Sequence, residues 1–231
     1  MASLYDLSTS AIRRIYDRRV LSAPVLDVEP YFPDARRFQS VWPQLRDEAL
    51  QVAEELKRVP RFHELMPEQA AISANDGRDW RMLVLKAYGT SFPRNLERCP
   101  ALAATIASAP DVLSAALSFL APGKHVPEHR GPFRGVIRFY MGLSVPVGPD
   151  GHPAAVLTIN HCEHRVGNGE CLLWDDTYPH EVLNRGGRVR IALLLDVRRR
   201  GMPLDMALLS RILIAGVGAS IRLRKASLDG N

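Results

Sequence analysis

Between residues 118 and 197 the chain is divided into short apolar segments by turns that contain glycine and proline, and this pattern limits the fold more than any other feature. Two of the turns are Gly148-Pro149-Asp150-Gly151 and Gly167-Asn168-Gly169. Many short strands at such spacing are typical of an all-β sandwich or barrel. The predicted strands cover 118–121, 135–145, 155–160, 163–166, 171–174 and 189–197.

The N-terminal half follows a mainly helical pattern. Apolar residues recur at helical spacing between Pro43, which suits a first helical turn, and Pro60, which ends the pattern. Segments 100–107 and 111–117 each predict a short helix, and the apolar segment 80–88 predicts a strand. We expect an α+β fold, mainly β, in one domain over 1–203. A helical part, about 1–117, would pack on a β core, about 118–200.

Composition, cysteine content and the N-terminal sequence indicate a folded protein of a reducing compartment. Hydrophobic residues make up 46% of the 231 residues and charged residues 24%, an ordinary globular balance. Cys99, Cys162 and Cys171 form neither a CxxC pair nor a disulfide framework. Charged residues precede any apolar run at the N-terminus, which does not fit a signal peptide. The expected location is the cytoplasm.

The C-terminal stretch carries the positive charge of the chain. The net charge is +5, and ten basic but only three acidic residues lie in 185–231. Segment 204–231 predicts a basic amphipathic tail, too short and too charged to span a bilayer. Its apolar residues could share one helix face: Met206, Leu209, Ile212, Leu213 and Val217. Two alternatives stay open, namely peripheral contact with an anionic membrane and packing on the domain itself. Nucleic-acid binding is not favoured, because no basic patch is interleaved with aromatic residues.

Seven histidines offer candidate metal ligands, yet no HExxH or Cys/His zinc pattern occurs. The HxE spacing of His161-Cys162-Glu163 lies beside a turn, with little chain downstream to bring round a second strand. We interpret it as a chance match. The better pair is His129, next to one predicted strand, and His180, next to another.

Arg190 lies inside the apolar strand 189–197, ten residues after His180. An unpaired charge in such a strand is costly, so the guanidinium needs an anionic partner. Its planar fork suits a carboxylate. The partner could be a dicarboxylate co-substrate at an iron site, or a protein carboxylate such as Asp175 or Asp196.

These residues belong to a longer pattern. It comprises Ser118, His129-Arg130-Gly131-Pro132, Arg138-Phe139-Tyr140, Asp175-Asp176-Thr177-Tyr178-Pro179-His180-Glu181, and Arg190. The pattern resembles the aspartyl/asparaginyl β-hydroxylase family over roughly residues 78–200. That family includes bacterial hydroxylases of lipid A and ornithine-lipid acyl chains. The resemblance implies a double-stranded β-helix (a cupin-like jelly roll) that uses Fe(II), 2-oxoglutarate and O2.

The resemblance also implies roles for individual residues. His129 and His180 would ligate the iron, and Gly131 would stand where many relatives of this chemistry carry a carboxylate. Arg190 would bind the distal carboxylate of 2-oxoglutarate, with Ser118 beside it. Tyr140, where the family commonly has a histidine, would contact the co-substrate. Arg138 would contact the substrate. Asp176 and Glu181 would orient the two histidines.

The substrate stays open at this point. One reading is hydroxylation of a lipid acyl chain at the inner face of the membrane. Tyr16-Asp17-Arg18-Arg19 and Cys99-Pro100 also resemble the lipid-acting bacterial branch. A second reading is β-hydroxylation of an aspartyl or asparaginyl residue, or of an amino-acid-derived small molecule. A third is a non-catalytic jelly-roll binding module, because a fold alone does not give a function.

Overall fold

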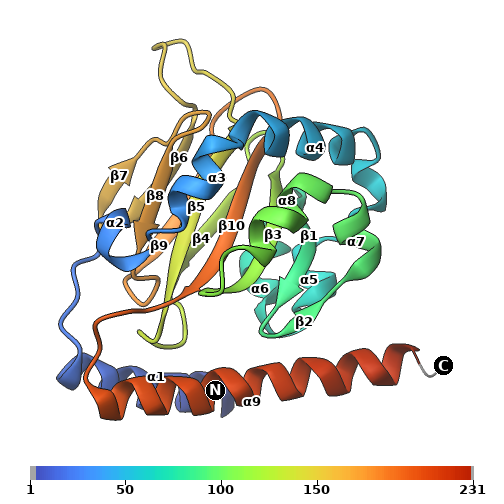
Figure 1. Ribbon diagram of the computed structural model, residues 1–231. Coiled ribbons are helices and arrows are strands. Elements are labelled where there is room, and N and C mark those ends of the chain that lie inside the picture. The colour runs from blue at the N-terminus through green and yellow to red at the C-terminus, as the bar shows by residue number, and fades with distance from the viewer. Residues whose placement is uncertain (1–3, 230–231) are drawn as a thin grey trace.

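Two antiparallel β-sheets face each other in the computed structural model, which describes the backbone of residues 4–229 and the side chains of residues 9–223 (Figure 1). The six-stranded sheet has the order β2 (Thr90–Ser91), β1 (Trp80–Ala87), β3 (Val112–Leu120), β10 (Arg190–Arg198), β5 (Val136–Ser144), β8 (Cys171–Trp174). The four-stranded sheet has the order β4 (His125–His129), β9 (His180–Asn184), β6 (Ala155–Ile159), β7 (Cys162–His164). Because strands distant in sequence lie side by side in both sheets, the predicted jelly roll is confirmed.

The helix predicted over 111–117 is wrong, because those residues belong to β3. This strand lies between β1 and β10, and nearly all of its residues are buried. A strand covered on both faces is a continuous apolar run, and such a run has no period that separates it from a buried helix. The β structure therefore begins well before residue 118, and the strand predicted over 80–88 is confirmed as β1.

Side-chain alternation along β10 and β5 divides the interior into two layers. On β10, Ile191, Leu193 and Leu195 face the helices, whereas Ala192 and Leu194 face the second sheet. Successive side chains of a strand point to opposite faces, so Arg190 falls on the same face as Ala192. The same rule places Arg138 and Tyr140 of β5 on the inner face. The space between the sheets thus receives the polar residues of the sequence pattern.

Helices cover the outer face of the six-stranded sheet (Figure 1). They are α2 (Val28–Tyr31), α3 (Ala35–Ser40), α4 (Trp42–Glu54), α7 (Pro93–Glu97) and α8 (Pro100–Ala107). Pro43 occupies the first turn of α4, as the sequence predicts. Phe32 and Phe38 pack with Phe139 of β5, their ring centres 5.2 and 6.2 Å from it. This apolar layer holds the sheet in place from behind.

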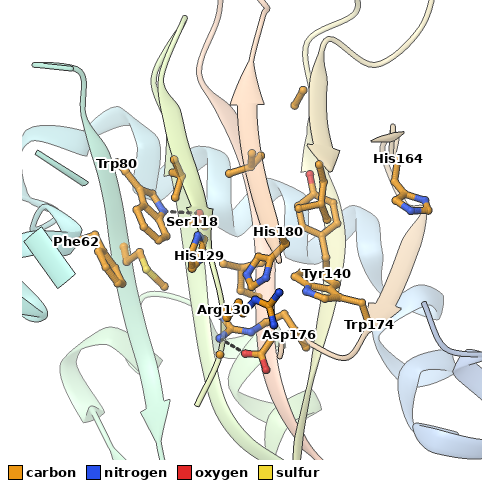
Figure 2. A pocket seen from close by; sticks show the side chains of 18 of the residues that line it. Phe62, Trp80, Ser118, His129, Arg130, Tyr140, His164, Trp174, Asp176 and His180 are labelled. Carbon is orange, nitrogen blue, oxygen red and sulfur yellow. Dashed lines mark hydrogen bonds and ion pairs between the residues drawn. The ribbon is translucent and has the colours of Figure 1, made fainter. Parts of the chain in front are cut away.

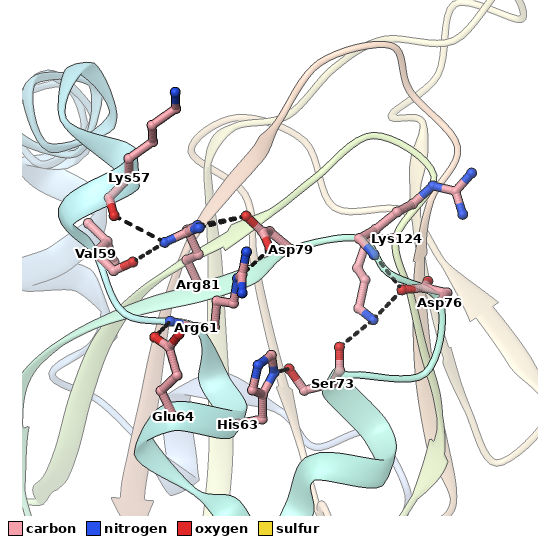
Figure 3. Close-up of polar contacts among 11 residues, drawn as sticks. Lys57, Val59, Arg61, His63, Glu64, Ser73, Asp76, Asp79, Arg81 and Lys124 are labelled. Atoms are coloured by element: carbon pink, nitrogen blue, oxygen red, sulfur yellow. Dashed lines mark hydrogen bonds and ion pairs between the residues drawn. The ribbon is translucent and has the colours of Figure 1, made fainter.

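Short helices between α4 and β1 form one end wall of the sandwich, and a buried lysine fixes it (Figure 3). These helices are η1 (Leu56–Arg58), α5 (Phe62–Leu65), η2 (Pro67–Gln69) and α6 (Ala70–Ser73). The Lys124 ammonium is fully buried and donates to the Ser73 carbonyl, Asn75 Oδ1 and Asp76 Oδ1 at 2.7, 2.6 and 2.6 Å. The wall is therefore tied to the loop before β4.

Helices α1 (Leu4–Arg19) and α9 (Leu204–Asp229) lie together beneath the sandwich (Figure 1). Tyr16 and Met206 share an apolar cluster with Phe133, and the hydroxyls of Tyr16 and Ser210 are 2.7 Å apart. Arg19 forms an ion pair with Asp205 at 2.6 Å. The tail therefore packs on its own domain along one face.

The outer face of α9 is apolar and exposed. Leu204, Leu208 and Ile212 follow one another at helical spacing with 89, 60 and 61% of their surface exposed. Ile212, which the sequence placed on one face with Met206, is thus directed away from it, and Val217 of the same predicted face is 40% exposed. The expectation that this segment is too short and too charged to span a bilayer is not met, because by length and composition alone Leu204–Leu223 is long and apolar enough to cross a membrane. Residues 230–231 of the predicted tail lie outside the described residues.

Candidate active site

A pocket of about 150 Å³ lies between the inner faces of the two sheets (Figure 2). Much of its wall is apolar, formed by Phe62, Trp80, Met82, Val126, Leu157, Trp174, Val182 and Leu194. Its polar residues are Ser118, His129, Arg138, Tyr140, Asp176, His180 and Arg190 among others. The structure thus brings together all the site residues expected from the sequence except Glu181.

Two neighbouring strands bring His129 and His180 face to face. They are direct partners in the register of β4 and β9, beside an irregularity between Val126 and His129. Their ring centres are 4.2 Å apart. Two residues separated by 51 positions in sequence therefore meet because each lies at the end of a paired strand.

Backbone carbonyls fix the orientation of both imidazoles. Nδ1 of His129 lies 2.9 Å from the carbonyl oxygen of Pro127, and Nδ1 of His180 lies 2.9 Å from that of Tyr178. A carbonyl only accepts, so each Nδ1 must carry the proton and each Nε2 is left with a free lone pair. This is the arrangement of a metal-ligating histidine. The expectation that Asp176 and Glu181 orient the rings is not met, since carbonyls fill that position.

Burial keeps both imidazoles neutral at neutral pH. Loss of solvation, together with the nearby His129, lowers the pKa of His180 to about 3. Loss of solvation also lowers the pKa of His129. A neutral imidazole is the form that binds a metal, so no proton has to be displaced before a cation can bind.

Arg190 is a buried cation that forms no ion pair with a carboxylate of the described residues. It is 3% exposed, and it donates a long hydrogen bond, 3.4 Å, to Ser118 Oγ. Among the described residues its Nε atom has no hydrogen-bond partner. The carboxylates weighed from the sequence are engaged elsewhere, Asp175 with Arg199 at 3.0 Å and Asp196 with Arg138 at 2.9 Å. Burial lowers the pKa of Arg190, which reflects the cost of this charge.

Ser118 and Tyr140 surround the Arg190 side chain. The Trp80 indole donates to Ser118 Oγ at 3.1 Å, and the Arg190 guanidinium lies 5.6 Å from the centre of the Tyr140 ring. Figure 2 shows Ser118 and Tyr140 on opposite sides of the pocket. Trp80 stacks in turn on Phe62, with ring centres 4.0 Å apart. One end of the pocket thus combines a cation with hydroxyl groups, which is a suitable site for a carboxylate.

Arg138 lines the pocket but is already paired. Its Nε atom lies 2.9 Å from Asp196 Oδ1, and Nη2 lies 3.5 Å from Asp176 Oδ2. Tyr88 donates to the other oxygen of Asp196 at 3.0 Å. Burial raises the pKa of Asp176 to about 7, and the neighbouring carboxylates add to the rise while Arg138 opposes it. Arg138 therefore belongs to an internal network with two carboxylates, although its Nε atom and Asp196 Oδ1 have no hydrogen-bond partner among the described residues.

Gly131 leaves space that the Asp176 carboxyl group fills. A Cβ atom at residue 131 would come within 2.2 Å of Asp176 Cγ. The Gly131 amide also donates to the Asp176 carbonyl at 2.6 Å. Any side chain at residue 131 would displace Asp176, so the absence of a carboxylate there is built into the packing.

The donor set suits a cation bound by two imidazoles. Within the described part of the chain, no third His, Cys, Asp or Glu joins them in a group able to hold a metal. Two free Nε2 atoms leave several coordination positions for water and a chelating co-substrate, as non-haem iron oxygenases require. The orphaned Arg190 matches the anionic end of such a co-substrate. These residues fit Fe(II) with 2-oxoglutarate.

Other residues singled out in the sequence lie away from this centre. Glu181 forms an ion pair with His125 at 2.8 Å. In the HxE match, Cys162 and Glu163 are exposed on β7, and Glu163 contacts Arg185 at 3.3 Å. The interpretation of that match as chance is supported. The sequence did not indicate Phe62 or His164 as pocket residues, because neither lies in a recognisable motif.

The fold and the site define a class of protein, namely a cupin-like double-stranded β-helix with a pocket in which two histidines face each other. A sequence model of the aspartyl/asparaginyl β-hydroxylase family matches residues 39–200. The chain belongs to this family.

Relatives show the range of the family. The chain is 33% identical over 173 residues to the ornithine lipid ester-linked acyl 2-hydroxylase of Rhizobium tropici, covering 75% of this chain and 59% of that protein. It is 25% identical over 195 residues to aspartate β-hydroxylase domain-containing protein 2 of Rattus norvegicus, covering 77 and 53%. The chain thus spans little more than half the length of these relatives.

Solved structures share part of the architecture. A predicted oxalate decarboxylase from Thermotoga maritima is 18% identical, with a TM-score of 0.35, covering 52% of this chain and 81% of that chain. A cupin domain of a transcriptional regulator from Enterobacter cloacae is 20% identical, with a TM-score of 0.31, covering 38 and 82%. The fold assignment itself rests on the two facing sheets.

Proposed function

We propose that this protein is an Fe(II)- and 2-oxoglutarate-dependent hydroxylase that inserts oxygen into an unactivated C–H bond of a lipid acyl chain. The single observation that carries the proposal is Arg190. It is a buried cation without a carboxylate partner among the side chains that the structure describes, and it lies in the same pocket as two histidines with free Nε2 atoms. Such a charge is costly unless a ligand completes it.

Six polar residues of the pocket have a role in this proposal. His129 and His180 would hold the iron, and Arg190 with Ser118 and Tyr140 would bind the distal carboxylate of 2-oxoglutarate. Bound together, the metal and co-substrate would activate O2 and supply the oxidising power for C–H hydroxylation. Asp176, which lines the same pocket, would orient water beside the histidines. The apolar wall would exclude bulk water and hold the substrate carbon.

Three observations favour a lipid substrate. The pocket wall is largely aliphatic and aromatic, which suits a hydrocarbon chain. The Rhizobium relative acts, by its name, on an acyl chain of ornithine lipid. Arg138, which a substrate carboxylate would need in the aspartyl or asparaginyl reading, already has two protein carboxylates, Asp196 and Asp176, at 2.9 and 3.5 Å. A lipid acyl substrate therefore agrees better with the pocket than an aspartyl or asparaginyl substrate.

The outer face of α9 would place the enzyme on the membrane that holds such a substrate. The exposed Leu204, Leu208 and Ile212 could enter the interface, and the exposed Arg211 would lie near anionic headgroups. We propose peripheral binding at the cytoplasmic face. A Leu208→Gln, Ile212→Gln variant should then bind anionic vesicles more weakly than wild type. Val147→Gln, which changes an exposed residue in the turn after β5, should not.

One spectroscopic experiment tests the cofactor assignment without a substrate. Under anaerobic conditions, Fe(II) and then 2-oxoglutarate are added to the purified protein, and the visible charge-transfer band of the chelate is recorded. Wild type should give the band, and His180→Ala should not. A folded wild-type protein that gives no band would refute the proposal and favour the non-catalytic binding module.

A further inference from the structure

A second pocket, of about 340 Å³, adjoins the candidate active site. It lies between α1 and the loops around residues 130–134 and 177–179. Its lining is almost entirely polar: Ser10, Arg13, Arg14, Asp17, Arg130, Arg134, Asn160, Thr177, Tyr178 and Pro179. Four arginines against one aspartate make it strongly cationic.

Two of the arginines build the pocket. Arg134 contacts Asp17 at 3.1 Å and Asp175 at 3.3 Å, and it donates to the Val20 carbonyl at 2.8 Å. Arg13 donates to the Gly131 carbonyl at 3.1 Å and to Ser10 Oγ at 3.2 Å. These contacts fix α1 against the loops that carry the candidate metal site.

The other two arginines are available to a ligand. Arg14 and Arg130 are both exposed, and neither forms an ion pair with a side chain that the structure describes. The only acidic residue of the lining, Asp17, is already paired with Arg134. Two free guanidinium groups beside the paired Arg13 and Arg134 suit a phosphate or a carboxylate, because arginine binds both bidentately.

The two pockets share a wall. Arg130 lines both of them. Within one loop, Asp176 and His180 line the first pocket, whereas Thr177, Tyr178 and Pro179 line the second. A ligand that extends from one pocket to the other would therefore have its anionic group close to the part of the ligand that lies beside the histidine pair.

We propose that the arginine pocket binds the anionic headgroup of the substrate lipid, a phosphate or carboxylate, while the acyl chain enters the apolar pocket. The proposal rests on the proposed function and extends it, because it predicts hydroxylation at a carbon near the polar end of the chain. Ser10, Arg13, Arg14 and Asp17 come from α1, outside the region 39–200 that matches the family. Headgroup binding would thus depend on residues outside the part of the chain that matches the family model.

Binding of simple amphiphiles tests the headgroup pocket without turnover. N-Dodecanoylglycine and its uncharged amide share one chain and differ in the carboxylate, and titration calorimetry gives the two affinities. A hydrogen-bonded charge contributes about 1.5–3 kcal/mol, so the acid should bind about tenfold or more tighter. Equal affinities would overturn the proposal. Dodecyl phosphate should also bind more tightly than inorganic phosphate, and equal binding of these two would indicate a site for free anions instead.

Substitutions locate the preference. Arg14→Gln combined with Arg130→Gln should reduce the tenfold preference to about threefold or less. Arg18→Gln, one helical turn further along α1 and outside the pocket lining, should keep it. Equal losses in both variants would refute a localised pocket. Since the Fe(II)–2-oxoglutarate band of wild type is recorded separately, failure of the cofactor assignment and failure of the headgroup pocket are told apart.

Discussion

Two buried cations, Lys124 and Arg190, lie in contrasting surroundings. The Lys124 side chain is fully buried, and its ammonium has three oxygen acceptors within 2.7 Å. Arg190 is 3% exposed, yet it has one long contact with a serine hydroxyl and an Nε atom without a partner in the described residues. Both charges carry the cost of leaving water, and only the first is compensated by the protein.

The contrast separates a structural charge from a binding charge. Lys124 joins the loop before β4 to the end wall that includes Phe62, so its compensation is complete in the free protein (Figure 3). Arg190 lies in a pocket, so its compensation can come from a ligand. Burial alone does not distinguish these roles, but the count of satisfied donors does.

The largest expected effect is the loss of stability in Lys124→Met. Removing the ammonium leaves the Asp76 carboxylate and two other acceptors without their donor, and breaking a buried pair costs about 3–5 kcal/mol. For a chain of this size the midpoint of thermal unfolding should fall by roughly 10 °C. Lys57→Met, at an exposed lysine of the same wall, is the matched control and should unfold as wild type does. A Lys124→Met protein as stable as wild type would remove the distinction between the two cations.

Arg190→Met should show the opposite behaviour. The free protein loses an uncompensated charge, so its stability should be unchanged or higher. Its affinity for 2-oxoglutarate, read from titration of the Fe(II) chelate band, should fall about 30-fold or more, because truncating one partner of a buried charge pair costs about 2–5 kcal/mol. The exposed Arg185→Met should leave affinity intact. If Arg190→Met unfolds as easily as Lys124→Met, Arg190 is a structural residue.

Gly131→Ala tests whether the pocket is tightly packed around Asp176, in contrast to the incompletely paired surroundings of Arg190. The added methyl group would collide with the Asp176 carboxyl group, and overpacking costs about 1–3 kcal/mol. Chemical denaturation measures the loss. Asp176→Ala in the same chain should restore part of it, since the two changes act on one contact. Additive effects in this double-mutant cycle would show that the two residues do not meet.

The sequence alone could predict the special position of Arg190 but not that of Lys124. Arg190 was identifiable because a charge interrupts an apolar strand, and such a pattern requires a partner. Lys124 follows Pro122-Gly123, in a turn where an exposed lysine is ordinary. Its acceptors Asn75 and Asp76 lie 49 and 48 positions earlier, so only the folded chain shows that they meet.

The same reasoning explains the rest of the site. His129 and His180 were found because each lies beside a strand within a motif, and pairing of β4 with β9 joins them. The segment 111–117 was misread because burial on both faces removes the period of a strand. The arginine pocket could not be predicted from the sequence, because Arg14 and Arg130 are 116 positions apart and only the packing of α1 brings them together.

Tyr140→Phe should give the smallest effect and sharpens the description of the Arg190 end. Tyr140 is buried near the guanidinium, and its hydroxyl has no described hydrogen bond in the free protein. Removing the hydroxyl should leave stability unchanged and weaken 2-oxoglutarate binding about threefold to tenfold, the contribution of one hydrogen bond. Tyr140→His keeps a donor and is the control. If Tyr140→Phe binds 2-oxoglutarate as wild type does, Arg190 and Ser118 alone hold the carboxylate. The unsatisfied charge, rather than the hydroxyl groups around it, then determines the binding.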